Sequence, residues 1–168
     1  MPNQRRALGD VFELVSKKIK HEDKIKVLHD HASQPLFYVL RIAYNEIGWA
    51  LPEGAPPYKE YKGRKGSGPT DLMAECKRMY VFFAGLEPNM PKFRREKLFQ
   101  DVLESLEAHE AELLLSVKDH SLEKKYKLPR KVVEAAFPGL LTPPFDLKFG
   151  HKPVGPIAMM PGPLWDPR

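Results

Sequence analysis

Apolar residues recur with a helical period over most of the first 141 residues. The clearest case begins near Pro91, and its apolar positions fall on one side of the helix. They are Leu98, Phe99, Val102, Leu103 and Leu106. A stripe this wide has to be buried against other helices. We therefore predict a helix here, at the centre of a helical core.

Start and stop signals divide the rest of this region into further short helices. Asp10 with Glu13 three residues later matches a helix cap, Ser33 precedes a proline that a first turn tolerates, and Gly85 is a typical stop. The predicted helices cover 10–20, a short stretch after Asp23, 33–47, 70–84, 109–118 and 128–137. Together with the central helix they predict an all-α fold.

Two stretches break the helical pattern. Residues 51–69 are rich in proline and glycine, so we predict a long inter-helix loop that is either functional or mobile. Residues 138–168 hold eight of the 17 prolines, which favours extended chain. The predicted architecture is one compact domain of about six or seven short helices over 1–141, followed by an extended proline-rich arm over 142–168.

Composition narrows the class of protein. Cys76 is the one cysteine, so it has no partner within the chain, and this fits a reducing compartment. The sequence has no long apolar run and no secretory leader at its start. We therefore expect a soluble intracellular protein without membrane contact.

Known catalytic motifs are not found. The glycine-rich stretch 63–70 lacks the Gly-Lys-Ser/Thr ending of a nucleotide-binding loop, and no Gly-x-Ser-x-Gly turn occurs. Ser121 and Lys124 match a nucleophile spacing, but no companion motif accompanies them. We predict a protein that is not an enzyme and has no catalytic residues. An enzyme built from scattered acids such as Asp101 and Glu104 is the alternative.

Metal-ligating residues do not gather in the sequence. His29 and His31 are two positions apart, which in a helix points their rings in nearly opposite directions. Cys76 falls on an inward stripe with Met73 and Met79, as a buried thiol does. We predict no metal site and no cofactor.

Two predicted helices start with cations, at positions where acids are the usual residues. A helix N-terminus carries partial positive charge and favours acids. The central helix nevertheless opens with four cations and Glu96, and the last helix is preceded and begun by cations. An external anion such as phosphate would offset this cost. The alternative is that these cations are solvated and screened.

Nucleic acid is the polyanion that such clusters would bind, with phosphate neutralisation and little reading of bases, so affinity should fall steeply with salt. The predicted phosphate-binding residues are Lys92, Arg94, Arg95, Lys97, Lys124, Lys125, Lys127 and Arg130, with Lys62, Arg64 and Lys65 in the loop. The aromatic side chains predicted to stack on bases are Tyr61, Phe93 and Tyr126. The net charge of +5 suits such a partner without requiring one.

Three blocks of the sequence carry a resemblance. The segments 51–59, 98–119 and 136–141, within a span of roughly 8–141, resemble a family of small uncharacterised proteins of T-even-like tailed phages, including cyanophages. That family has no established activity, so the resemblance implies no site residue. It implies a viral accessory protein in the host bacterial cytoplasm, or in the virion. Its partners would be DNA or RNA, or phage or host replication or transcription proteins.

A structural or protein-interaction role is the competing class. In that case the arm over 142–168 would lie over a neighbouring virion protein. Its anchors would be Phe145, Phe149 and Trp165, since large aromatic side chains dominate such interfaces.

Overall fold

The structure is a computed structural model that describes residues 7–45, 47–61, 69–142 and 147–148. Its elements are α1 (Leu8–Lys17), α2 (His21–Asp30), α3 (Gln34–Ala43), α4 (Leu72–Glu75), the 3-10 helix η1 (Cys76–Phe82), α5 (Lys92–Ser105), α6 (Ala108–Lys118), α7 (Leu122–Lys125) and α8 (Arg130–Ala136). Within the described ranges there is no named strand, so the predicted all-α fold is confirmed. No described helix combines the length and the apolar character that crossing a membrane needs.

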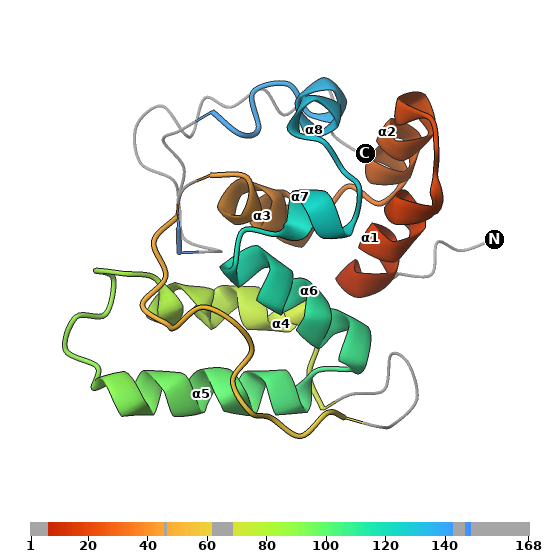
Figure 1. Ribbon diagram of the computed structural model, residues 1–168. Coiled ribbons are helices and arrows are strands. Elements are labelled where there is room, and N and C mark those ends of the chain that lie inside the picture. Colours follow the sequence, from red (N-terminus) through yellow and green to blue (C-terminus); the bar gives the residue numbers. More distant parts are fainter. Residues whose placement is uncertain (1–6, 46, 62–68, 143–146, 149–168) are drawn as a thin grey trace.

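Helix α6 forms the centre of the fold (Figure 1). It packs against α1, α3, α5 and α7, and seven of its eleven residues are buried. Helix α5 packs against α6 and η1 at the lower edge. Its side chains Phe99, Val102 and Leu103 are buried as predicted, but the prediction that this helix forms the centre is wrong. Polar residues interrupt the buried face of α6, namely Glu110, Ser116 and Lys118, so α6 shows no clean apolar stripe and the pattern pointed to α5 instead.

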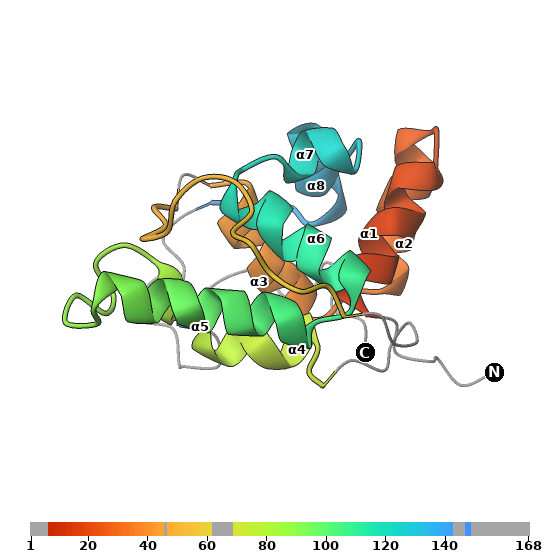
Figure 2. The same ribbon diagram turned by 60° about the horizontal axis from the view of Figure 1, so that its bottom comes forward.

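The two N-terminal helices, α1 and α2, cover another side of the core. Helices α1 and α2 pack on each other, α1 also packs on α6, and α2 on α8. Aromatic rings join these layers: Phe37 lies edge-on to Phe137 with centroids 5.1 Å apart, and Phe12 meets Tyr126 at 5.6 Å. Figure 2 shows α7 and α8 above α6, with α5 below it. The core therefore has α6 as the middle layer.

One buried carboxylate holds two helix starts on α6. Glu110 accepts hydrogen bonds from the backbone N–H of Gly9 at 2.6 Å and from that of Leu72 at 3.0 Å. These amides lie in the first turns of α1 and α4, where no partner exists within the helix. A Cβ at Gly9 would lie 3.1 Å from the carbonyl carbon of His109, so only glycine lets α1 approach this closely. Glu110 thereby fixes the positions of α1 and α4 on α6.

The predicted loop is confirmed over 51–61, where it is held against α5 and α6. The backbone N–H of Lys59 donates to Glu104 at 2.9 Å, and that of Gly54 donates to Asp119 at 3.2 Å. The buried Lys118 ammonium donates to the carbonyl of Pro52 at 2.7 Å and to Asp119 at 2.5 Å. Residues 62–68 lie outside the described part of the chain.

Two predicted helix starts are confirmed by their caps, and one is wrong. Ser33 Oγ accepts from the N–H of Leu36 at 3.2 Å, and Asp71 accepts from the N–H of Ala74 at 2.8 Å. Asp10 is not a cap, because α1 begins earlier and Asp10 lies in its first turn. The predicted helix 33–47 ends at residue 43 in the structure.

Tertiary contacts shorten two predicted helices. The predicted helix 70–84 becomes α4 followed by η1, and its end is drawn to another segment: Ala50 N–H donates to Phe82 O at 2.8 Å, and Ala84 N–H donates to Gly48 O at 2.8 Å. Helix α1 ends at Lys17, so Ile19 falls in the turn before α2 and is 93% exposed. Periodicity alone does not reveal where such turns occur.

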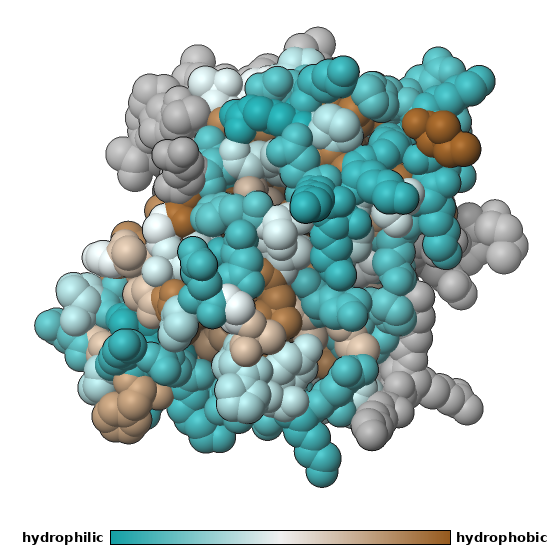
Figure 3. Space-filling view, viewed as in Figure 1, coloured by the Kyte–Doolittle hydropathy of each residue, from teal (hydrophilic) through white to brown (hydrophobic). Residues whose placement is uncertain are grey.

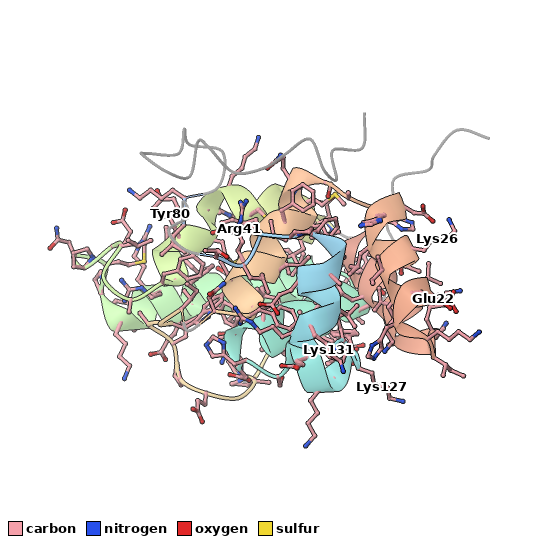
Figure 4. All side chains as sticks on the ribbon, turned by 90° about the horizontal axis from the view of Figure 1, so that it is seen from above. Glu22, Lys26, Arg41, Tyr80, Lys127 and Lys131 are labelled. Carbon is pink, nitrogen blue, oxygen red and sulfur yellow. The ribbon has the colours of Figure 1, made fainter. Side chains whose placement is uncertain are left out.

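The described residues of the predicted arm touch the helical domain. The hydroxyl of Tyr38 donates to the carbonyl of Leu147 at 2.6 Å, and the ammonium of Lys148 lies 5.0 Å from the centroid of the Tyr80 ring. Nearby in sequence, Arg41 Nε donates to Leu140 O at 3.3 Å. Figure 4 labels Arg41 and Tyr80 on this side of the molecule. The rest of the arm lies outside the described residues, and the domain boundary at 141 stays a prediction.

Replacing Glu110 by alanine should destabilise the fold by about 3 kcal/mol, because two buried N–H groups lose their acceptor. Replacing Glu112, which is exposed on the same helix, should change the free energy of unfolding by less than about 0.5 kcal/mol. Urea unfolding of the two variants beside the unchanged protein measures both values. Equal changes in the free energy of unfolding for the two substitutions would contradict the role of Glu110 as the acceptor for both helix starts.

The stabilising effect of Glu110 should depend on pH. Burial raises the pKa of its carboxyl group above the ordinary value near 4.5, although the two backbone N–H groups act in the opposite direction. The folded state therefore binds the proton more tightly, and this contribution is complete below the unfolded pKa and is lost as pH rises through the folded pKa. The stability difference between the unchanged protein and Glu110→Gln should shrink from about pH 4 to pH 7 in urea unfolding. A difference that grows over this range would show that the pKa is lowered.

Candidate functional site

The two basic segments predicted from the sequence lie at different ends of the molecule. The first turn of α5 lies at the lower left in Figure 1, whereas α7 and α8 lie above α6. Figure 2 shows the same separation from another direction. The structure therefore does not bring the two predicted sets of cations together, and each has to be considered as a separate surface.

At the α5 end, half of the predicted cations have partners in the protein. Arg95 is 8% exposed, and its guanidinium donates to the carbonyls of Val81 at 2.9 Å and Glu87 at 2.5 Å. The prediction of Arg95 as a phosphate ligand is therefore wrong, because the side chain holds the end of η1 and the following turn. Lys97 forms an ion pair with Asp101 at 2.9 Å.

The remaining residues of this turn point to solvent. Lys92 and Arg94 are exposed, and Phe93 between them is 78% exposed. An open groove of about 440 Å³ lies beside them. Its lining residues are Ala50, Leu51, Pro52, Lys92 and Arg95. Figure 3 shows apolar colour over the start of α5, at the lower left edge of a face that also carries apolar patches near its centre and at the upper right.

The second basic segment spans α7 and the start of α8. Residues 124–131 contain five cations and no acid. The acids on either side both bond to Arg130: Glu134 accepts from its guanidinium Nε at 3.2 Å, and Glu123 accepts from its backbone N–H at 3.2 Å. Arg130 also donates to the carbonyl of Tyr44 at 2.5 Å. Its guanidinium is therefore engaged within the protein, and the prediction that Arg130 is free to hold phosphate does not fit.

Four lysines of this segment are exposed, and a buried lysine of α2 lies against the segment. The exposed residues are Lys124, Lys125, Lys127 and Lys131. Lys24 of α2 is 5% exposed, and its ammonium donates to the carbonyl of Lys127. Burial and the nearby charge of Lys127 both lower the pKa of Lys24. We call these five residues the α7–α8 basic surface.

The surroundings of this surface include acids on α2. Glu22 and Asp23 are exposed in the first turn of that helix. Figure 4 shows Lys127 and Lys131 on one side of the molecule, where α8 meets α2. The sequence does not single out Lys24, because it is one of two lysines on a helix that carries several charges. Only the packing of α2 on α8 reveals its place.

The aromatic residues predicted to stack on bases differ in exposure. Tyr126 is 5% exposed and packs against Phe12, so the stacking prediction for Tyr126 is wrong. Tyr61 is partly buried in an isolated bridge with Glu107. Phe93 is the predicted stacking residue whose ring is open in the described structure. The burial of Tyr126 could not be foreseen because α7 was not predicted as a helix.

Several predicted residues fall on parts of the chain that the structure does not describe. The loop cations are Lys62, Arg64 and Lys65, and the proposed arm anchors are Phe145, Phe149 and Trp165. Their predicted roles stay predictions.

The candidate metal ligands have other partners. His29 Nε2 lies 2.6 Å from the carbonyl of Ala136, and His31 Nδ1 lies 2.9 Å from that of Val27. Burial raises the pKa of the Cys76 thiol to about 12, so it is protonated at neutral pH. Over the described residues, no three potential ligands come together around a metal position.

Fold and surface together define a small all-α protein with basic exposed segments at two ends. A family model matches residues 11–124, and the chain belongs to this family of unknown function, DUF6433. The matched span includes α5 and ends within α7. No curated protein and no solved structure matches the chain.

The two neighbouring arginines of α5 should differ in their effect on stability. Arg95→Ala removes a buried side chain and the hydrogen bonds that it donates to the carbonyls of Val81 and Glu87, so it should cost about 1–3 kcal/mol. Arg94→Ala changes an exposed side chain and should cost less than about 0.5 kcal/mol. Thermal and urea unfolding measure this difference. An Arg95→Ala protein as stable as Arg94→Ala would show that the two carbonyl contacts are dispensable.

Proposed function

We propose that this protein binds nucleic acid without catalysis, through phosphates held at the α7–α8 basic surface. The main support is the set of four exposed lysines within 124–131, whose flanking acids Glu123 and Glu134 are both bonded to Arg130. Exposed lysines are the usual phosphate contacts of proteins that bind nucleic acid irrespective of sequence. The extended anionic backbone of a nucleic acid can meet several such lysines at once.

The buried lysine of α2 supports an anionic partner as well. Lys24 bonds to a carbonyl oxygen, and its neighbour Lys127 carries the same charge. Two neighbouring cations repel each other, and a buried cation is costly unless an opposite charge compensates it. A phosphate bound at Lys127 would supply that charge.

The biological setting of the proposal comes from the resemblance to proteins of tailed phages. In that setting the protein is an accessory factor in the host bacterial cytoplasm, acting on DNA or RNA together with replication or transcription proteins. Membership of DUF6433 is compatible with this setting but does not assign it. The protein-interaction class depends on arm residues outside the described part of the chain.

Binding should fall steeply with salt and should depend on the lysines of this surface. In gel shifts or fluorescence anisotropy, replacing Lys124, Lys125 and Lys127 by glutamine should lower affinity at about 0.1 M salt by at least about tenfold. It should also reduce the slope of log affinity against log salt by about 2–3, because each duplex phosphate contact contributes about 0.9. Glutamine keeps most of each side chain, so the fold is retained.

A matched variant controls for the change in net charge. Replacing Lys26, Lys59 and Lys77 by glutamine removes three exposed lysines that lie on α2, the 51–61 segment and η1. Affinity should then stay within about threefold of that of the unchanged protein. No binding at low salt, or equal losses in the two triple variants, would overturn the proposal. Loss of binding only on removal of 142–168 would assign the function to the arm.

A further inference from the structure

The ring of Phe93 is exposed where the surrounding residues give it no cover. Phe93 is 78% exposed on the first turn of a fourteen-residue helix, although an aromatic ring of this size normally contributes to a core or an interface. Among the described large apolar side chains, Ile19 is the other one this exposed, but it has no flat face. Phe93 therefore offers a stacking platform that the fold itself does not use.

The residues that flank this ring in the sequence supply positive charge. Lys92 and Arg94 are exposed on either side of Phe93, and no acid is bonded to them in the described structure. The acids that follow on α5 are Glu96, which is partly buried, and Asp101, which is paired with Lys97.

This arrangement matches the chemistry of an unpaired nucleotide. A nucleotide joins a flat apolar ring to an anionic phosphate, and the α5 end places a flat apolar ring between two cations. In a duplex the bases are stacked on one another and offer only their edges in the grooves. A base can lie on the face of Phe93 only if it is unstacked, so the ring selects single strands.

We infer that the first turn of α5 is a second nucleic-acid contact, at which a base of a single strand stacks on Phe93 while Lys92 and Arg94 hold the adjoining phosphates. The inference rests on the proposed function and adds a preference for single strands to it. Because the α7–α8 basic surface lies at the other end of the molecule, one surface can be changed without altering the other (Figures 1 and 2).

The test measures fluorescence anisotropy with three probes, of which the two single strands have the same number of phosphates. They are an oligothymidine of about 12 nucleotides, an abasic strand of equal length, and a duplex that carries the same sequence. Phe93→Leu keeps the apolar side chain but removes the ring face, and Phe93→Tyr keeps the ring. Both substitutions are at an exposed position, and urea unfolding verifies that the fold is retained.

If a base stacks on Phe93, removing the ring should lower the affinity for one probe only, the oligothymidine. Phe93→Leu should weaken binding of oligothymidine about tenfold, and should leave the abasic strand and the duplex within about twofold of their original affinities. Phe93→Tyr should retain the affinity for oligothymidine. Equal affinity of the unchanged protein and Phe93→Leu for oligothymidine would overturn the inference, as would an equal loss on all three probes.

The failure of this inference can be distinguished from the failure of the proposed function. If the glutamine variant of Lys124, Lys125 and Lys127 loses binding while Phe93→Leu does not, the α7–α8 basic surface is supported and the stacking site is contradicted. If only Phe93→Leu loses oligothymidine binding, the stacking site stands alone. An oligoglutamate peptide that competes for the α5 end as well as oligothymidine does, with Phe93→Leu unaffected, would identify an acidic protein partner instead.

Discussion

The fold depends on a buried carboxylate that receives the first backbone N–H groups of two helices. Glu110 of α6 bonds to Gly9 and to Leu72, which are far apart in the sequence. A helix start buried without a partner for its N–H groups would be costly, and here one acidic side chain satisfies two starts. The absence of a side chain at Gly9 makes the contact close enough. Glu110 therefore determines how α1 and α4 pack on α6.

This packing determines where the exposed charges lie. With α6 as the middle layer, α5 lies on one side, while α7 and α8 lie on the other. The cations of the two segments are therefore separated, and some of them serve the fold: Arg95 holds the end of η1, and Arg130 holds the carbonyl of Tyr44. What is left for a partner is a group of lysines around α8 and a cation-flanked ring on α5. The two surfaces differ in chemistry, and we propose that they bind different features of one nucleic acid, phosphates at the first and an unstacked base at the second.

Local signals in the sequence predict much of the fold, but they do not show which residues form the candidate sites. Ser33 and Asp71 were recognisable as caps because capping depends on near neighbours in the sequence. The central role of α6, the burial of Tyr126 and the place of Lys24 depend on contacts between distant segments, which periodicity does not encode. Arg95 and Arg94 are indistinguishable in the sequence, yet one is buried and the other exposed. Charge density indicated which segments to consider, but only the packing shows which of their cations are available.

The most direct test of the account is amide hydrogen exchange, followed by mass spectrometry, with and without a single-stranded oligonucleotide. Bound phosphate and stacked base should slow exchange over 122–131 and over the first turn of α5, while η1 exchanges at an unchanged rate. This pattern would place the ligand on the two exposed basic surfaces. Unchanged exchange over 122–131 at saturating oligonucleotide would contradict the claim that the α7–α8 basic surface holds nucleic acid.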